Sequence, residues 1–198
     1  MSGQTLTAGV IAVQGDVAEH AAAVRAAGAQ AGWDVTVEQI RTAGSVTECD
    51  VLLLPGGEST TIAGHLRREG IDAEIAAHIA AGRPLLATCA GLIVIAADTG
   101  DPRVEPLSLL DVTVDRNAFG RQVDSFEAEL AVAGLDAPFP AVFIRAPVIT
   151  RTGPGVQPLA AFDGATVAVR SGPITATAFH PELTGDDRIH QLALFDRL

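Results

Sequence analysis

Apolar runs alternate with segments of helical periodicity along the first half of the chain. Strands are predicted where apolar residues follow one another, at residues 9–13, 35–37, 51–54 and 84–87. Helices are predicted between and after them, at residues 16–25, 60–68, 71–81 and 92–97. Asp16 is expected to cap the first helix and Gly28 to end it. This β-α-β-α order predicts a parallel sheet covered by helices on both faces.

The second half of the chain has a different pattern. Short strands between glycine and proline turns are predicted at residues 111–114, 126–130, 141–144, 166–169 and 174–179, and a closing helix near residues 187–195. We interpret these strands as an antiparallel element inserted in the second half of the sheet. No internal repeat or linker divides the sequence, so we expect a single α/β domain over residues 1–198.

The composition is that of a globular protein with a sizeable core. The chain has 198 residues, and 48% of them are hydrophobic, which is enough for one core. No uninterrupted apolar run approaches the ~20 residues that a membrane helix needs, so we expect no association with a membrane. Cys49 and Cys89 have very different neighbours and are expected to be free thiols in a reducing compartment. We therefore expect a cytoplasmic protein.

The charge of the chain is strongly acidic. The formal net charge is −11, and all 13 basic residues are arginine. Binding to nucleic acid needs a basic surface, so we expect no nucleic-acid partner. An acidic, lysine-free composition fits either a salt-adapted source or a GC-rich genome, and neither bears on the chemistry.

Cys89 is the strongest candidate for a reactive residue. It lies between a predicted strand and a predicted helix, and ligands bind at the carboxyl ends of strands in such sheets. The small residues Ala87, Ala90 and Gly91 allow the tight turn that lifts a nucleophile above the sheet. The N-terminus of the following helix stabilises a thiolate. The alternative interpretation is a buried structural cysteine, which is the commoner role of a lone thiol.

A second motif, Phe179-His180-Pro181-Glu182-Leu183, lies near the C-terminus. Positions i and i+2 at the end of a strand face the same side, so Glu182 can hold the imidazole of His180 while the other ring nitrogen faces Cys89. A thiol, an imidazole and a carboxylate supply the nucleophile, base and orienter of acyl transfer. A His-Pro-Glu tripeptide alone is usually an ordinary loop. The other histidines lie on predicted helices, where solvated or capping roles are expected: His20, His65, His78 and His190.

A glycine-rich turn follows the strand predicted at residues 51–54, with the sequence Pro55-Gly56-Gly57-Glu58-Ser59-Thr60. Two adjacent glycines let backbone N–H groups point into a cavity. Such groups, together with the N–H of Ala90, can form an oxyanion hole. A phosphate-binding loop is the main alternative, but the Gly-Lys-Ser/Thr sequence that it needs is missing. A plain turn is the third interpretation.

Metal binding is not predicted. Two isolated cysteines and scattered histidines lack the spacing of a ligand set. Cys49 lies between Glu48 and Asp50, whose charges disfavour a thiolate, so we interpret it as structural. We expect neither a metal nor another cofactor.

The motifs together resemble the class I, or triad, glutamine amidotransferases. More closely, the chain is similar nearly end to end to the family of glutaminase subunits of two-protein pyridoxal 5′-phosphate synthases. The residues that carry the resemblance are Val13-Gln14-Gly15-Asp16, Glu19-His20, Leu54-Pro55-Gly56-Gly57-Glu58-Ser59-Thr60-Thr61, Thr88-Cys89-Ala90-Gly91-Leu92, Asp115-Arg116-Asn117-Ala118-Phe119-Gly120-Arg121-Gln122, Asp124-Ser125-Phe126-Glu127, Phe143-Ile144-Arg145-Ala146-Pro147 and the His180 motif. The triad alone indicates only the superfamily of class I glutamine amidotransferases. The Gly-Gly-Glu-Ser-Thr-Thr and Arg-Asn-x-Phe-Gly-Arg-Gln sequences narrow the resemblance to the glutaminase subunits.

The resemblance implies a fold and a set of roles. The fold is a three-layer α/β sandwich with a mainly parallel, flavodoxin-like central sheet. The catalytic residues are Cys89 as nucleophile, His180 as general acid and base, and Glu182 as orienter. The oxyanion hole is formed by Gly57 and Ala90. The residues that bind L-glutamine are Gly56, Gly57, Glu58, Arg116, Ile144 and Arg145.

Arg116 and Arg145 could bind the substrate or could form ordinary salt bridges at the surface. A guanidinium fork suits the α-carboxylate of the substrate, and Glu58 suits its ammonium. Arginines also form ordinary surface salt bridges, so Arg116 is favoured over Arg145, whose backbone is expected to matter more. Ala87 stands where the family often has glycine.

The function implied is hydrolysis of L-glutamine to glutamate and ammonia through a thioester. The ammonia would pass to a pyridoxal 5′-phosphate synthase subunit in a large hetero-oligomer. One alternative is a glutaminase for another synthase, such as imidazole glycerol phosphate synthase. A non-enzymatic, chaperone-like stress protein of the same architecture is the other, but such proteins lack the late His-x-Glu motif.

Overall fold

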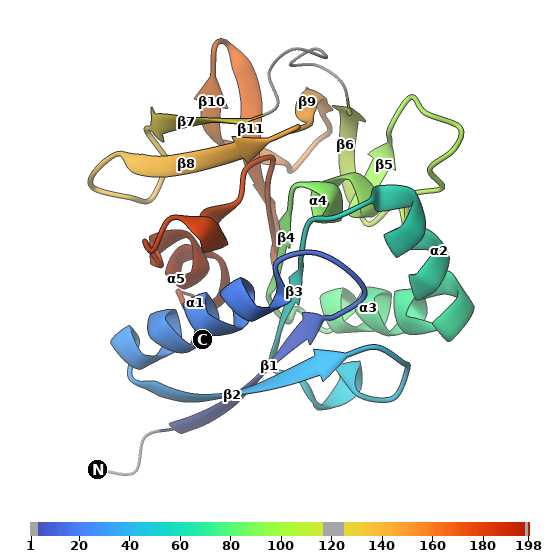
Figure 1. Cartoon of the computed structure of the whole chain (residues 1–198), viewed down its shortest axis with the longest axis vertical. Helices are drawn as coiled ribbons and strands as arrows, with labels where there is room; N and C mark the ends of the chain where they lie inside the picture. Colours follow the sequence, from blue (N-terminus) through green and yellow to red (C-terminus); the bar gives the residue numbers. More distant parts are fainter. Residues whose placement is uncertain (1–3, 117–124, 197) are drawn as a thin grey trace.

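The computed structural model describes residues 4–116, 125–196 and 198, and Figure 1 shows their arrangement. The central sheet contains β1 (Gln4–Ile11), β2 (Trp33–Ile40), β3 (Val51–Leu54), β4 (Leu85–Thr88), β5 (Ala96–Asp98), β6 (Leu110–Asp115), β9 (Val148–Thr152), β10 (Gln157–Phe162), β11 (Ala165–Ser171) and β12 (Ile174–Thr177). A separate pair contains β7 (Ser125–Leu130) and β8 (Phe139–Ile144). The helices are α1 (Val17–Gln30), α2 (Ser59–Glu69), α3 (Ile71–Ala80), α4 (Ala90–Ile95) and α5 (Arg188–Leu194), with short 3-10 turns η1 (Val46–Glu48) and η2 (Pro181–Leu183).

Five neighbouring strands form a parallel sheet in the order β2-β1-β3-β4-β12. This is the strand order of flavodoxin-like folds. Helices α1 and α5 lie on one side of these strands and α2 and α3 on the other (Figure 1). β3 and β4 are buried along their whole length, as expected of strands covered on both faces. The predicted three-layer α/β architecture with a mainly parallel sheet is confirmed.

The second half of the chain extends this sheet with antiparallel strands. β11 pairs antiparallel with β12, β9 and β10, and β6 pairs antiparallel with β9. The β7–β8 hairpin lies beside β10 and β11 at one end of the sheet (Figure 1). The expected antiparallel element is therefore present. Two of its strands, β9 and β10, were not predicted; β10 contains Pro158, which weakens a strand signal, and pairs with β11 alone.

Gly28 does not end the first helix, and this prediction is wrong. α1 continues to Gln30, and a Cβ on Gly28 would lie 2.2 Å from Cγ2 of Val35. The glycine is therefore needed for the close packing of α1 against β2, not as a stop. The helix predicted at residues 92–97 also differs: α4 begins at Ala90, and Ala96 already pairs in β5.

Three helical histidines are buried instead of solvated, which corrects a second expectation. His20 and His190 have no exposed surface, and His78 is only 4% exposed. Burial lowers the pKa of His78 and brings the pKa of His190 to about 4. Burial, followed by the charges of His190 and His180, lowers the pKa of His20 well below its ordinary value. These side chains are therefore neutral in the folded protein near neutral pH.

The packing at Gly28 predicts opposite effects for two Gly→Ala substitutions inside helices. Gly28→Ala should lower the free energy of unfolding by about 1–3 kcal/mol, because its Cβ overlaps Val35. Gly64→Ala, on α2, should raise it by about 0.5–1 kcal/mol, because a Cβ there meets nothing within 4 Å. Urea denaturation measures both. Equal effects of the two substitutions would contradict the packing described.

The buried histidines predict a loss of stability in mild acid. Between pH 6.5 and about 4 the unfolded chain protonates His190 and the folded chain does not. The unfolded state then binds more protons, so the free energy of unfolding falls as pH falls, by up to ~1.4 kcal/mol per pH unit for this residue. Urea denaturation at several pH values should show a shallower slope for His190→Gln than for the wild type. An unchanged slope would show that His190 does not contribute.

Candidate active site

The site lies where four neighbouring parallel strands end. β1, β3, β4 and β12 pair side by side, and their carboxyl ends meet at one edge of the sheet. Each end leads into a segment that the sequence had marked: the Gln14 turn, the glycine-rich turn, Cys89 and the His180 motif. The edge of such a sheet at its carboxyl ends is the usual position of a ligand site.

Cys89 lies on a strained turn between β4 and α4. Its backbone has φ 50° and ψ −108°, a conformation that non-glycine residues rarely adopt. Its N–H donates to the carbonyl of Thr177 at 2.8 Å, which ties the turn to β12. A Cβ on Gly91 would lie 2.2 Å from the carbonyl oxygen of Leu54, so only glycine fits there. The small residues around Cys89 thus permit the turn, as expected.

His180 and Glu182 form a close pair behind Cys89. His180 Nδ1 lies 2.7 Å from Glu182 Oε1, and both side chains are buried. The N–H of His180 donates to the carbonyl of Val142 at 2.8 Å, which fixes the backbone against β8. Because Nδ1 is engaged by the carboxylate, Nε2 is the ring nitrogen available to the thiol.

The environment of this pair favours a charged imidazole. Burial by itself lowers the pKa of His180, but hydrogen bonds and charge interactions with Cys89 and Glu182 outweigh it and raise the pKa to about 10. Burial raises the pKa of Glu182, and the bond to His180 opposes that rise. An imidazolium next to a thiol is the arrangement that stabilises a thiolate.

Asp16 is a member of the site that sequence reasoning assigned elsewhere. It occupies the N-cap position of α1, but its side chain makes no capping hydrogen bond. Its Oδ2 lies 3.4 Å from Nδ1 of His180. The prediction of a capping role is wrong, because the end of β1 brings this carboxylate to the neighbouring imidazole. The sequence carried no signal for this contact, because β3 and β4 lie between β1 and β12 in the sheet and the strand order is known only from the structure.

The glycine-rich turn lies directly against the reactive residues. A Cβ on Gly56 would lie 2.9 Å from Cε1 of His180 and 3.4 Å from Cβ of Cys89. Gly57 has φ +130°, which only glycine adopts readily. The N–H of Glu58 donates to Oε1 of Gln14 at 2.9 Å. Both glycines are therefore required by the geometry, and Gln14 holds the turn from the side of β1.

Glu58 and Arg116 contact each other across the site. Glu58 caps α2, because its carboxylate accepts a hydrogen bond from the N–H of Thr61 at 2.9 Å. The pKa of Glu58 is lowered to about 2, mainly by the hydrogen bond that its carboxylate accepts from the side chain of Thr60. Arg116 Nη2 lies 3.3 Å from Glu58 Oε1, and Arg116 Nη1 lies 2.9 Å from Asp101 Oδ2. Asp101, which the sequence did not single out, thus orients Arg116.

One cavity of about 460 Å³ contains most of the predicted residues. Its lining comprises Gly15, Asp16, Gly57, Glu58, Ser59, Cys89, Ala90, Ile93, Arg116, Ile144, Arg145 and His180. Cys89 Sγ lies 3.9 Å from the carbonyl oxygen of Ile144, and Arg145 has φ 43°. Two predicted residues are not part of this lining. Glu182 lies behind His180, and Gly56, in the glycine-rich turn, packs against His180 and Cys89. The predicted residues within 117–124 lie outside the described part of the chain.

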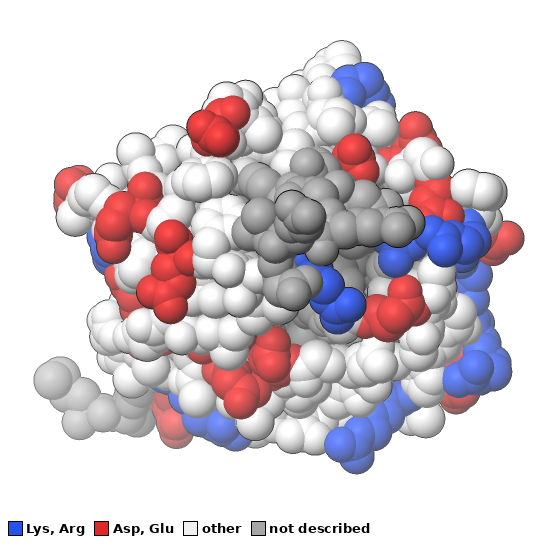
Figure 2. Space-filling model, turned by 45° about the horizontal axis from the view of Figure 1, so that its top comes forward, with Lys and Arg blue, Asp and Glu red and all other residues white. Residues whose placement is uncertain are grey.

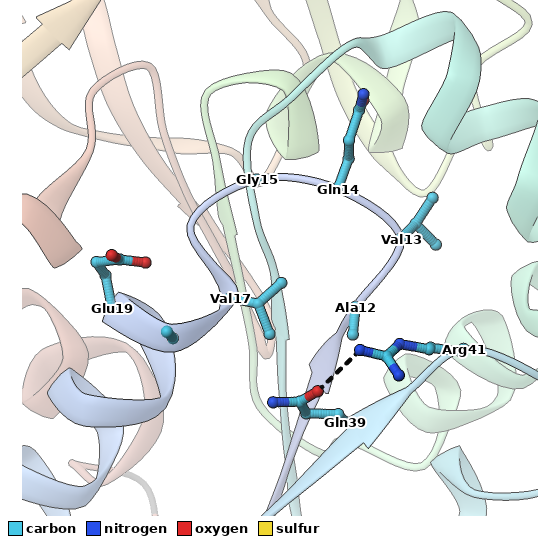
Figure 3. Close-up of a pocket in the computed structure, with 9 residues that line it drawn as sticks. Ala12, Val13, Gln14, Gly15, Val17, Glu19, Gln39 and Arg41 are labelled. Carbon is cyan, nitrogen blue, oxygen red and sulfur yellow. Dashed lines mark hydrogen bonds between the residues drawn. The ribbon is translucent and has the colours of Figure 1, made fainter.

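A second hollow, of about 400 Å³, lies on the other side of the Gln14 turn (Figure 3). Gln14 points away from Gln39, near the end of β2, and from Arg41, just after that strand; these two residues are joined by a 3.2 Å hydrogen bond (Figure 3). Its lining contains neither thiol nor imidazole. The Cys89 thiol and the His180 imidazole line the first cavity instead.

One group of potential metal ligands lies among residues 4–116, 125–196 and 198: Asp16, His180 and Glu182 have ligand atoms within 4.8 Å of one another. His180 Nδ1 and Glu182 Oε1 already lie 2.7 Å apart, so we interpret the two carboxylates as partners of the His180 imidazole and not as metal ligands. Cys49 is buried, and burial followed by the charges of Glu38 and Asp50 raises its pKa to about 11. This agrees with a structural thiol.

Acidic and basic side chains both occur on the face shown in Figure 2. In the described part of the chain, every helix is too short or too polar to cross a membrane.

Comparisons with known proteins agree with this geometry. The model of the SNO glutamine amidotransferase family matches residues 10–196. The chain is 68% identical over 193 residues to a pyridoxal 5′-phosphate synthase subunit PdxT of Halobacterium salinarum, covering 98% of this chain and 95% of that protein. It is 64% identical over 190 residues to the subunit of the same name from Halorubrum lacusprofundi, covering 96% of each.

Solved structures give the same result for the fold. A crystal structure of a glutamine amidotransferase superposes with a TM-score of 0.83 at 43% identity, covering 93% of this chain and 95% of that one. PurLQS from Thermotoga maritima superposes with a TM-score of 0.63 at 15% identity, covering 94% and 92%, and supports the fold alone. The arrangement of Cys89 and His180, the strand order and these matches lead to one conclusion: the chain belongs to the SNO glutamine amidotransferase family.

Proposed function

We propose that this chain hydrolyses the side-chain amide of L-glutamine, releasing glutamate and ammonia, through a thioester on Cys89. The observation that carries the proposal is the buried His180–Glu182 pair at 2.7 Å beside a cysteine on a strained turn. A charged His180 stabilises the thiolate of Cys89, which is the attacking form of a cysteine. Membership in a glutamine amidotransferase family supports the choice of glutamine.

The first half of the reaction forms the thioester. The Cys89 sulfur attacks the amide carbon of glutamine, and the carbonyl oxygen becomes an oxyanion. Gly57 and Ala90 line the same cavity, and in this proposal their N–H groups bind that oxyanion. The carbon–nitrogen bond then breaks, and His180 gives its proton to the leaving nitrogen, which departs as ammonia.

The second half restores the enzyme. Neutral His180 takes a proton from water as the water oxygen attacks the thioester carbon. The carbon–sulfur bond breaks, glutamate leaves, and the thiolate and imidazolium form again. Glu182 keeps Nδ1 of His180 protonated and the ring oriented throughout, and Asp16 at 3.4 Å adds a second negative charge at the same nitrogen.

The amino-acid head of glutamine is assigned to the far end of the cavity. Glu58 and Arg116 carry opposite charges and contact each other at 3.3 Å, so both must turn partly toward a substrate that has an ammonium and a carboxylate. Asp101 holds Arg116 from behind. Gly56, Ile144 and Arg145 complete the binding site through their backbone positions near Cys89.

The ammonia serves a synthase partner in this proposal. The two relatives at 68% and 64% identity are named as subunits of pyridoxal 5′-phosphate synthase. This supports the same role here in preference to the imidazole glycerol phosphate or stress-protein alternatives. The chain would act as one glutaminase domain over residues 1–198, within a large hetero-oligomer. A cytoplasmic location is supported by two cysteines that are both free thiols.

Substitution of the triad tests the mechanism. Cys89→Ala and His180→Ala should each lower glutamate release by about 10⁴-fold or more, because triad members act as a unit. Glu182→Gln should be milder, since packing also orients His180. Cys49→Ser is the control: its thiol is also buried but has no imidazole in its motif, and activity should be retained. Near-normal turnover by Cys89→Ala would overturn the thioester mechanism.

Co-expression with a cognate synthase subunit tests the partner. The two chains should co-elute as a species larger than this chain, and glutamate release at saturating glutamine should rise when the synthase subunit is added. We expect this increase because a glutaminase that works only beside its synthase partner does not lose ammonia to the solvent. Separate elution together with equal rates would leave a free-standing glutaminase.

A further inference from the structure

The chain buries two histidines immediately behind the triad, and the mechanism above does not use them. His20 from α1 and His190 from α5 have no exposed surface, and His20 Nδ1 lies 3.3 Å from His190 Nε2. The other ring nitrogen of His20, Nε2, lies 3.3 Å from Glu182 Oε2 and 3.1 Å from Thr88 Oγ1. His20 therefore contacts the partner of His180 and the residue before Cys89 at once.

We propose that His20 is a positioning residue of the active site, whose Nε2–H holds the second oxygen of Glu182 while His190 fixes the opposite side of its ring. The inference rests on the assignment of Glu182 as the orienter of His180 under the proposed function. It adds one neutral imidazole behind the triad: His180 Nδ1 lies 2.7 Å from Oε1 of Glu182, and His20 Nε2 lies 3.3 Å from Oε2.

The charge of Glu182 selects the tautomer of His20. A buried carboxylate oxygen needs a donor, and a lone pair on Nε2 at 3.3 Å would repel it. Nε2 therefore carries the proton. His20 Nε2 lies 3.1 Å from Thr88 Oγ1 and 3.3 Å from Glu182 Oε2, a buried oxygen that has no hydrogen bond among the described residues. The N–H of His20 therefore lies next to a carboxylate oxygen that still needs a donor.

The contacts of His190 agree with that tautomer of His20. If Nε2 of His20 carries the proton, Nδ1 accepts from Nε2–H of His190. Nδ1 of His190 is buried and has no hydrogen-bond partner among the described residues. In this arrangement it is an acceptor without a donor, which proteins tolerate better than a buried N–H without an acceptor. The reverse tautomers would leave an N–H unpaired there and Glu182 Oε2 facing a lone pair.

The neutral state of His20 is consistent with its neighbours. The titratable groups that act on it are His190 from α5, Glu182 from η2 and, beyond Glu182, His180. Burial and the charge interactions with both histidines favour the neutral ring. A neutral donor can hold Glu182 without cancelling the negative charge that His180 requires.

Three substitutions of His20 separate a positioning role from a purely structural one. Gln places an amide N–H near the position of Nε2, Asn places one near Nδ1, and Leu supplies neither. His20→Leu and His20→Asn should lower kcat by about 10- to 100-fold, because a buried carboxylate oxygen loses its donor. KM for glutamine should change by less than about twofold, since Glu58 and Arg116 hold the substrate elsewhere. His20→Gln should stay within about fivefold of wild type.

His78→Leu is the matched control. His78 is also a buried helical histidine, and its Nε2 lies 3.1 Å from the carbonyl oxygen of Pro84, at the opposite end of β4 from Cys89. Its loss should lower stability but change kcat by less than about twofold. Equal kcat for the Gln and Asn variants of His20, or a kcat for His20→Leu within about twofold of wild type, would overturn the proposal.

Nitrogen NMR of the histidine rings in the wild-type protein tests the geometry without a variant and without turnover. His20 should be neutral at pH 7 with its proton on Nε2. A proton on Nδ1, or a charged ring, would overturn the proposal even if every variant failed to fold. Because this readout does not involve glutamine, a correct tautomer in a protein without glutaminase activity would point to a failure of the proposed function instead.

Discussion

The whole site depends on the parallel pairing of four neighbouring strands. β1, β3, β4 and β12 are hydrogen-bonded in one direction, so their carboxyl ends meet at one edge. Residues separated by more than 160 positions, such as Asp16 and His180, come within 3.4 Å of each other only because of this pairing. A slip of one residue in β12 would turn its side chains to the other face and remove His180 from Cys89.

The second constraint is electrostatic. His180 and Glu182 are almost fully buried, where an unpaired charge is costly. The structure meets this cost by pairing Glu182 with His180, and His180 with Cys89 as well. The same burial makes each interaction stronger than it would be in water. The electrostatic surroundings of Cys89 and His180 are therefore set by this buried pair.

Sequence reasoning predicted the central features because they depend on local signals. Continuous apolar runs gave the buried strands, and the Cys89 and His180 motifs follow two of those strands directly. It missed what depends on packing between distant elements. Gly28 was read as a helix stop, although its role is close contact with Val35. Asp101 carries no motif of its own, and the Glu19-His20 motif gives no sign of a contact with Glu182. Their partners Arg116 and Glu182 lie 15 and 162 positions away (116 − 101 and 182 − 20).

The central claim is that Cys89 attacks the side-chain carbonyl of glutamine in this cavity. A glutamine analogue with an electrophilic ketone at the side-chain position, followed by peptide mass spectrometry, tests it directly. The account predicts that Cys89 is labelled, that Cys49 is not, and that added glutamine slows the labelling of Cys89. Labelling of Cys49 at the same rate, or no protection of Cys89 by glutamine at any concentration, would contradict the account.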